Sequence, residues 1–145
     1  MSNSAPEVFL VNLRMGDENL SGGINCTMNL RVTPSTKKVQ GHSVVFQAIN
    51  PPLLVDSIIT GNYQYLCTNE KCRILIDVNG YYEEEDTCVK NFEARILLED
   101  NWKEGVANYA FYHDGEWISL SNQQVKATES LEILDYGKLA SVANN

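Results

Sequence analysis

The sequence predicts a single all-β domain in which about eight antiparallel strands follow one another along the chain. Apolar and polar residues alternate in nearly every segment, turn residues separate the segments, and no convincing helix lies between them. A chain of 145 residues suits one domain with one core. Because an open sheet of this size exposes strand edges, we expect an up-and-down barrel or a flattened barrel. A two-sheet β-sandwich is the alternative, since it uses the same alternation.

Three segments show the alternation most clearly, at residues 23–34, 72–80 and 91–100. In each of them every second side chain is apolar, as in a strand with one face in the core, and within residues 72–80 only Leu75 breaks the pattern. The core residues predicted from these segments are Ile24, Cys26, Met28, Leu30, Val32, Cys72, Ile74, Ile76, Val78, Phe92, Ala94, Ile96 and Leu98.

Five further strands are expected where β-branched and aromatic residues are frequent, at residues 7–14, 38–49, 54–67, 105–112 and 116–127. Glycine, proline and asparagine predict the turns between strands, at Gly22-Gly23, Pro34-Ser35, Asn50-Pro51-Pro52, Asn79-Gly80 and Asp114-Gly115. The antiparallel β domain is thus expected to span residues 1–127. Residues 128–145 are expected to form a C-terminal tail, either a short helix or a frayed end.

The charge balance argues against several classes of partner. The formal net charge is −8, and the basic residues are scattered apart from the pair Lys37-Lys38. Nucleic acids and anionic membranes are bound by clustered Lys and Arg, so we expect neither as a partner. The N-terminus lacks the basic and apolar regions of a secretory signal, and no stretch has the roughly 18 apolar residues of a membrane helix. We therefore expect a cytoplasmic location.

Cys67 and Cys72 flank the loop of a predicted hairpin, which places them opposite each other. A zinc site usually needs four ligands, and Cys26 and Cys88 do not form a second pair with that spacing. A redox motif would place its cysteines at the start of a helix. We interpret Cys67 and Cys72 as ordinary strand residues; a disulfide formed under oxidation is an alternative.

Signals of catalysis and of metal binding are weak. The acidic run from Glu83 to Asp86 lacks the alternate ligand spacing of a calcium loop, so we interpret it as a solvated loop. No nucleophile elbow, phosphate-binding loop or HExxH motif is present. His42 could act as an acid–base group with Asp56 or Asp77 only if these side chains converge. We therefore expect no cofactor and no metal, and we assign no catalytic residue.

Aromatic residues are the better candidates for ligand binding. Tyr63, Tyr65, Tyr109 and Trp117 lie on predicted strands, where they could line a cavity in the barrel, and Trp102 lies in a loop at one end. The alternative is that these five rings fill the core or cap the ends of the barrel. We take these five residues as the candidate ligand site.

Three segments of the chain resemble a known family. They are residues 30–41, 41–66 and 98–125, and their recurring features are Gln47-Ala48, Asn50-Pro51-Pro52-Leu53, Gly61, Asn101-Trp102 and Gly105 to Tyr109. The sequence is similar, over residues 7–127, to a bacterial family of small proteins known as domain of unknown function 1842. The resemblance implies a bacterial β-rich protein and brings no activity, cofactor or catalytic residue. Physically, Gly61 within a strand predicts a bulge or a close backbone approach.

Two classes of function follow from these observations. The first is a non-catalytic binding or interaction module, with an unknown small ligand or protein partner. The second is a small-barrel enzyme with His42 or Asp77 as its acid–base group. A structural homo-oligomer is a further alternative, because sheet edges and apolar faces can pair with a second copy.

Overall fold

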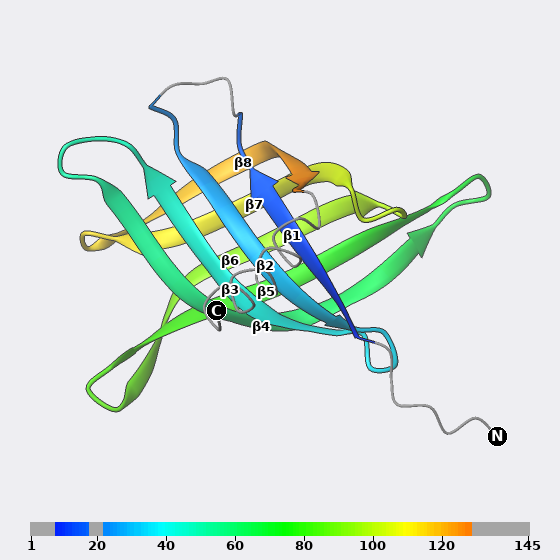
Figure 1. Ribbon diagram of the computed structural model, residues 1–145, viewed down its shortest axis with the longest axis horizontal. Helices are drawn as coiled ribbons and strands as arrows, with labels where there is room; N and C mark the ends of the chain where they lie inside the picture. The colour runs from blue at the N-terminus through cyan, green and yellow to red at the C-terminus, as the bar shows by residue number, and fades with distance from the viewer. Residues whose placement is uncertain (1–7, 18–21, 129–145) are drawn as a thin grey trace, which may run out of the picture.

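The computed structural model describes residues 8–17 and 22–128, which form eight strands in a closed antiparallel barrel (Figure 1). Each strand pairs with its neighbours in the chain, and β8 returns to pair with β1. The prediction of an up-and-down β-barrel is therefore confirmed. The strands are β1 (Phe9–Met15), β2 (Asn25–Thr33), β3 (Lys38–Gln47), β4 (Leu53–Cys67), β5 (Cys72–Glu84), β6 (Thr87–Glu99), β7 (Glu104–His113) and β8 (Glu116–Ala127).

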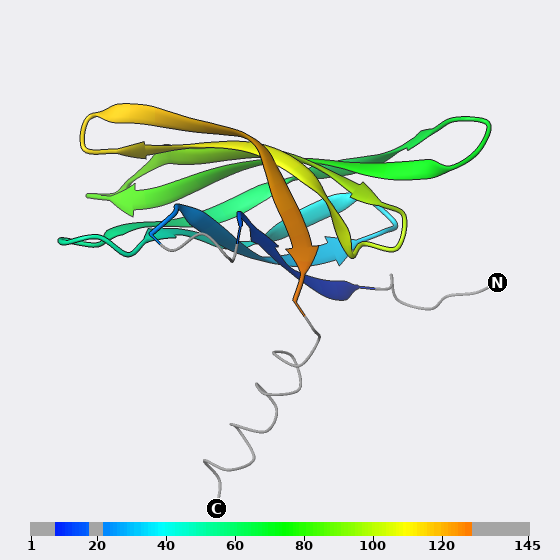
Figure 2. The same cartoon turned by 90° about the horizontal axis from the view of Figure 1, so that it is seen from above.

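The barrel is flattened, so that β1 to β3 form one layer and β5 to β7 the opposite layer (Figure 2). The long strand β4 and the last strand β8 cross from one layer to the other and close the barrel. Hairpins β2–β3, β4–β5 and β6–β7 lie at the end of the barrel where β1 begins, because successive strands run in opposite directions. We call this end the first end. The other hairpins lie at the second end.

The interior of the barrel is filled by side chains. As the alternation predicts, inward positions of all eight strands carry buried apolar residues. The largest fully buried side chains are Phe92, Phe111, Leu13, Met15, Met28, Leu30, Ile59, Ile74, Ile76, Ile96, Leu98 and Val32. Ligand binding inside the barrel would require displacing this core, so the outer surface and the two ends are the places to look for a site.

Gly61 shows the close backbone approach that its place within a strand predicts. It pairs with Val39 on one side and Val78 on the other, and a Cβ atom there would lie 1.9 Å from the carbonyl oxygen of Asp77. A side chain at this position would force β4 and β5 apart. Glycine is therefore required at residue 61 for packing.

The turn predicted at Asn79-Gly80 is wrong. Strand β5 continues to Glu84, and the chain reverses at Glu85 and Asp86, whose φ angles of 46° and 68° suit a two-residue hairpin turn. Gly80 instead lies beside a bulge between β5 and β6, where a Cβ atom would be 2.8 Å from that of Phe92. The Asn79-Gly80 pair predicted a hairpin turn because glycine is common in such turns. Glycine is also needed where two segments pack closely, and this second requirement explains Gly80.

The interpretation of Cys67 and Cys72 as ordinary strand residues is also wrong. The two residues pair across hairpin β4–β5 and are joined by a disulfide, while Cys26 is buried and free and Cys88 is exposed and free. The direct cross-strand register brings the two thiols within bonding range. The bond links the two strands at the tip of the hairpin, which projects from the first end of the barrel (Figure 1).

The predicted C-terminal tail lies outside the described residues, apart from Thr128. The backbone N–H of Thr128 donates a hydrogen bond to the carbonyl of Asn12 (2.8 Å), so the last described residue still lies against β1. Within the part of the chain that the structure describes, no helix has the length and apolar character to cross a membrane.

Candidate functional site

Three of the five candidate aromatic residues meet at the first end of the barrel. The ring of Trp102 contacts those of Tyr63 (5.1 Å between centroids) and Phe9 (5.2 Å) edge to face, and Tyr63 contacts Tyr65 at 5.9 Å. The ammonium group of Lys37 lies 5.8 Å from the ring centroid of Tyr63 and 5.4 Å from that of Tyr65. We call these five residues the barrel-end cluster. Its rings contact one another, as expected for a group that caps the core.

Burial within the barrel-end cluster follows the distance of each ring from the core. Tyr63 is 4% exposed, and burial raises the pKa of its hydroxyl. Tyr65 shares its face of the strand but lies beyond the end of the barrel and is 46% exposed. Trp102 has a positive φ of 63°, which turns the β6–β7 loop so that the indole packs on the core. The loop therefore closes the first end.

Tyr109 lies inside the barrel. Its ring packs between Phe92 (6.0 Å between centroids) and Phe111 (6.4 Å), and burial raises the pKa of its hydroxyl well above the ordinary range. Within the described residues that hydroxyl has no hydrogen-bond partner. Tyr109 is a core residue that lies beneath the outer surface of β7.

Trp117 faces outward near the second end. It pairs across β7–β8 with Tyr112, and the two rings lie edge to face with centroids 5.8 Å apart. Trp117 is 45% exposed and Tyr112 is 39% exposed. We call these two residues the outer aromatic pair. The five candidates thus occupy three separate places, and no single site contains them all.

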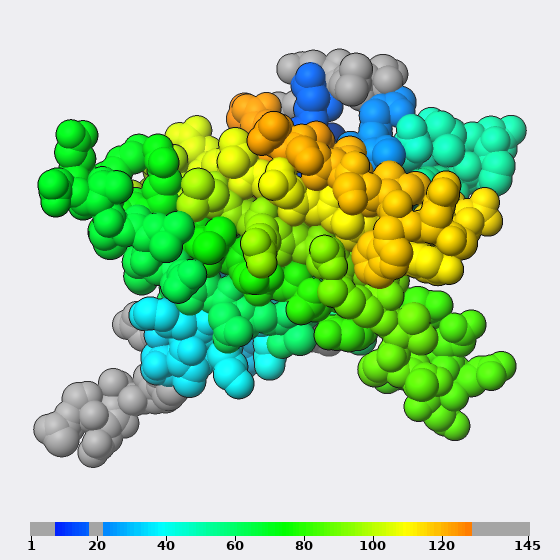
Figure 3. All heavy atoms as spheres, turned by 180° about the vertical axis from the view of Figure 1, so that it is seen from behind, coloured from blue at the N-terminus to red at the C-terminus, as the bar shows by residue number. Residues whose placement is uncertain are grey.

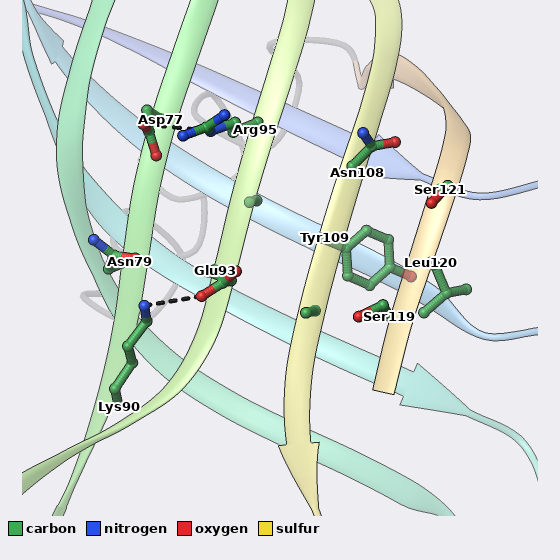
Figure 4. Close-up of a pocket in the computed structure, with 12 residues that line it drawn as sticks. Asp77, Asn79, Lys90, Glu93, Arg95, Asn108, Tyr109, Ser119, Leu120 and Ser121 are labelled. Atoms are coloured by element: carbon green, nitrogen blue, oxygen red, sulfur yellow. Dashed lines mark ion pairs between the residues drawn. The ribbon is translucent and has the colours of Figure 1, made fainter. Parts of the chain in front are cut away.

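By the strand register, the outer aromatic pair lies two residues beyond Ala110 and Ser119. These two residues help to line a groove of about 560 Å³ on the outer face of β5 to β8, the face turned toward the viewer in Figure 3 and drawn in close-up in Figure 4. We call it the outer groove. The surface is hollow there because the outward-facing side chains of Ala110, Ser119 and Ser121 are small. The residues that line it are Asp77, Asn79, Lys90, Glu93, Ala94, Arg95, Asn108, Tyr109, Ala110, Ser119, Leu120 and Ser121.

The β-sheet register sets the polar side chains of the outer groove in rows across the strands. One row runs from Asp77 through Arg95 to Asn108, and the next runs from Asn79 through Glu93 to Ala110. A register shift between β7 and β8 follows Ala107, and there the Asn108 side chain accepts a hydrogen bond from the backbone of Asn122 (2.8 Å). The bulge thus holds one wall of the groove in place.

The charged groups of the outer groove form two ion pairs (Figure 4). Asp77 Oδ2 lies 3.6 Å from Arg95 Nε, and Glu93 Oε1 lies 2.9 Å from Lys90 Nζ. All four side chains are well exposed, so the pairs are worth little for stability. Their effect is local: two acids and two bases leave the groove formally neutral.

The outer groove continues toward β4. A second hollow, of about 330 Å³, is lined by residues of β4 and β5 that include Asn62, Gln64 and Leu75, and it shares Asp77 and Asn79 with the groove. The polar surface therefore extends across five neighbouring strands, β4 to β8. This shape suits an elongated ligand.

Of the acid–base partners considered for His42, Asp56 lies close to it and Asp77 does not. His42 Nε2 contacts Asp56 Oδ1 on the outer surface, beside an apolar hollow formed with Ile58 and Tyr81. Asp77 lies elsewhere and pairs with Arg95. The two hydroxyls next to this pair in the sequence both face inward: Ser57 donates to Asn91 Oδ1 (2.7 Å), and Ser43 is fully buried, so neither is available to His42 as a nucleophile.

Metal-binding geometry gives no alternative site. Among the described residues, no three His, Cys, Asp or Glu side chains gather as a set of metal ligands.

Sequence reasoning missed most of the outer groove. It named Trp117, which lies beside the groove, Tyr109, which lies beneath it, and Asp77, which lines it but was considered there as an acid–base group. A signal was present, because neighbouring strands carry Asp77, Asn79, Arg95 and Asn108 at outward positions, and such polar positions adjoin one another in an antiparallel sheet.

Comparison with known proteins gives a family. The family model of a domain of unknown function, DUF1842, matches residues 7–117, so the similarity expected over 7–127 is found over most of that range. No curated protein matches the chain.

Proposed function

Because this chain belongs to the DUF1842 family, whose description assigns no activity, we propose a function from the surface of the barrel itself. The protein is a non-catalytic binding module, and its ligand binds in the outer groove on β5 to β8. The barrel acts as a support for the groove, since β5, β6 and β7 are paired on both sides and β8 is paired with β7 along most of its length.

One observation carries this proposal: at about 560 Å³ the outer groove is larger than the hollow beside Trp102 (about 250 Å³) and the hollow beside His42 and Tyr81 (about 420 Å³), and more polar side chains line it. Inside the barrel, Tyr109 packs against Phe92 and Phe111. At the first end, Trp102 packs against Phe9 and Tyr63. Binding sites generally combine a concave surface with a few convergent polar groups, and the outer groove has both.

The arrangement favours binding over catalysis. The two carboxylates of the groove, Asp77 and Glu93, each pair with a cationic side chain and are more than half exposed to solvent. Catalytic acids and bases usually lie in desolvated sites beside a group that tunes their proton affinity. An exposed, ion-paired carboxylate suits the orientation of a ligand better than proton transfer.

NMR spectroscopy of the ¹⁵N-labelled protein tests this proposal with a broad set of compounds. A library of small uncharged, anionic and cationic compounds is screened in mixtures, and amide shifts are mapped on the barrel. We expect the shifts to concentrate on residues 77–79, 93–95, 108–110 and 119–121. Shifts concentrated at the barrel-end cluster, or no response to any compound, would overturn the proposal.

A pair of variants controls for non-specific effects. Ser119→Phe places a large side chain in the groove and is expected to abolish the shifts. Thr27→Phe makes the same kind of change on the exposed face of β2, in the opposite layer. It is expected to leave them unchanged.

A further inference from the structure

The charge of the outer groove favours a neutral ligand. Each of the four charged side chains that line it has a partner of opposite sign, Asp77 with Arg95 and Glu93 with Lys90. An anion would have to compete with these carboxylates and with the net charge of −8 on the chain. A cation would have to displace Arg95 or Lys90.

The uncharged polar groups of the groove favour a ligand rich in hydroxyl groups. Side-chain amides, such as that of Asn79, and hydroxyls, such as those of Ser119 and Ser121, both donate and accept hydrogen bonds. A ligand hydroxyl does the same, so the two sets match. An apolar ligand would instead bury these groups without partners, which costs free energy.

Main-chain recognition of an extended peptide is confined to one border of this face. Strands β5, β6 and β7 are each paired on both sides, whereas β8 pairs with β1 only at Val125 to Ala127 and leaves the edge of residues 116–123 without a paired strand among the described residues. A peptide that adds a strand needs a free sheet edge. Recognition across β5 to β7 therefore depends on side chains.

The outer aromatic pair gives the groove an apolar platform. Tyr112 and Trp117 are the next outward-facing residues beyond Ala110 and Ser119, about 7 Å along the strands. Large aromatic rings that combine an apolar face with a polar atom suit ligands that are partly apolar and partly polar. The C–H face of a sugar ring packs on such a surface while its hydroxyls reach the polar rows.

These features converge on one class of ligand. We infer that the outer groove binds a neutral oligosaccharide chain, with a sugar ring packed on Tyr112 and Trp117 and its neighbours hydrogen-bonded by Asn79 and Ser119. The second hollow, which shares Asp77 and Asn79, accommodates further sugar units. The inference rests on the proposed function and specifies its ligand.

Titration with defined hexasaccharides tests this inference. Maltohexaose, cellohexaose and chitohexaose are neutral and differ in linkage and substitution, and a hexagalacturonate of the same length is the anionic control. Binding is followed by calorimetry and by the same amide shifts. We expect at least one neutral chain to bind in the groove and the anionic chain to bind at least tenfold more weakly.

Two matched pairs of variants locate the contact. Trp117→Ala is expected to weaken binding about tenfold, from the loss of one aromatic contact, whereas Tyr65→Ala removes an equally exposed ring at the first end and leaves binding unchanged. Asn79→Ala is expected to weaken binding, whereas Asn29→Ala, on the outer face of β2, has no effect. Far-ultraviolet circular dichroism checks that each variant is folded.

The outcomes separate the binding function from the class of ligand. If the groove responds to the compound library or to peptides but to no oligosaccharide, the ligand class is wrong and the binding function stands. If neither the library nor the oligosaccharides shift groove residues, both fail. If an oligosaccharide binds equally well to wild type, Trp117→Ala and Ser119→Phe, it binds elsewhere and the inference is overturned.

Discussion

The barrel-end cluster and the outer aromatic pair contain the same kinds of side chain and differ in what surrounds them. At the first end, Trp102 contacts Phe9 and Tyr63 and closes the core. On the outer face, Trp117 contacts Tyr112 alone among the ring contacts of the described residues and lies on β8 two residues before Ser119, which lines the open polar groove. The first arrangement uses aromatic area for stability, and the second leaves it available to a ligand.

This difference arises from the closure of the barrel. A barrel removes sheet edges along its sides but leaves two open ends, and large side chains cover the apolar core there. On the outer surface of the strands there is no apolar core to cover, so packing on the core does not explain why a half-exposed tryptophan lies there. Exposed aromatic residues beside a groove are therefore a better indication of binding than aromatic residues at a barrel end.

The largest expected effect separates the two tryptophans by stability. Trp102→Ala removes a ring that packs on the core and is expected to lower the free energy of unfolding by about 3 kcal/mol. Trp117→Ala removes one exposed edge-to-face contact and is expected to cost about 1 kcal/mol or less. Urea unfolding followed by circular dichroism measures both. Equal losses for the two variants would contradict the comparison.

The next effect concerns the hairpin that carries Tyr63 and Tyr65. The Cys67–Cys72 disulfide closes a short loop, and replacing both cysteines by serine is expected to lower the free energy of unfolding by about 2 kcal/mol. Groove resonances in the NMR spectrum should not move, because the hairpin tip lies at the first end. Chemical reduction of the wild type is the control and should reproduce the loss.

The same disulfide bears on cellular location. Cytosolic thiols are kept reduced, so a cytoplasmic location predicts that Cys67 and Cys72 are free in the host cell. Alkylation of thiols in intact host cells, followed by mass spectrometry, measures this. A protected, oxidised pair would contradict the cytoplasmic expectation.

The smallest expected effect concerns Tyr109, beneath the groove. Its buried hydroxyl has no partner among the described residues, so Tyr109→Phe is expected to be neutral or to stabilise by up to about 1 kcal/mol. Burial raises the pKa of this hydroxyl in the folded state, so its contribution is fully present below the ordinary value of 10.0 and is lost as pH rises above it.

A second buried group, Cys26, also contributes to the pH dependence of stability. Burial also raises the pKa of Cys26, from 9.0 to about 12, so part of the alkaline loss of stability is expected to remain in Tyr109→Phe. The slope of unfolding free energy against pH, compared between wild type and variant, gives the contribution of Tyr109, and the slope that remains in the variant includes those of Cys26 and Tyr63. A slope identical in both proteins would show that Tyr109 is not buried as described.

The fold was predictable because its main signal is local. Alternation within each segment identified the strands and the inward faces of 23–34, 72–80 and 91–100, and the number of strands favoured closure. The turn at Asn79-Gly80 failed because glycine serves packing there, at Gly80, while the reversal uses Glu85 and Asp86. Local patterns do not distinguish these two uses of glycine.

The outer groove was not predictable in the same way. It brings Asp77, Arg95, Asn108 and Ser119 together from four strands, and their alignment depends on hairpin lengths and on the register shift after Ala107. Likewise, Trp102 and Trp117 look equally plausible as ligand contacts until closure of the barrel places one on the core and the other on the wall.

Single-tryptophan variants give the most direct test of the central claim, that the outer groove and not the barrel end binds the ligand. The chain has two tryptophans, so Trp102→Phe reports from the groove and Trp117→Phe reports from the first end while keeping an aromatic ring in place. Each variant is titrated with the neutral hexasaccharides while its fluorescence is recorded. We expect a saturable change in the Trp102→Phe variant and none in the Trp117→Phe variant. A change only in the Trp117→Phe variant would place the binding site at the barrel end and rule out the outer groove.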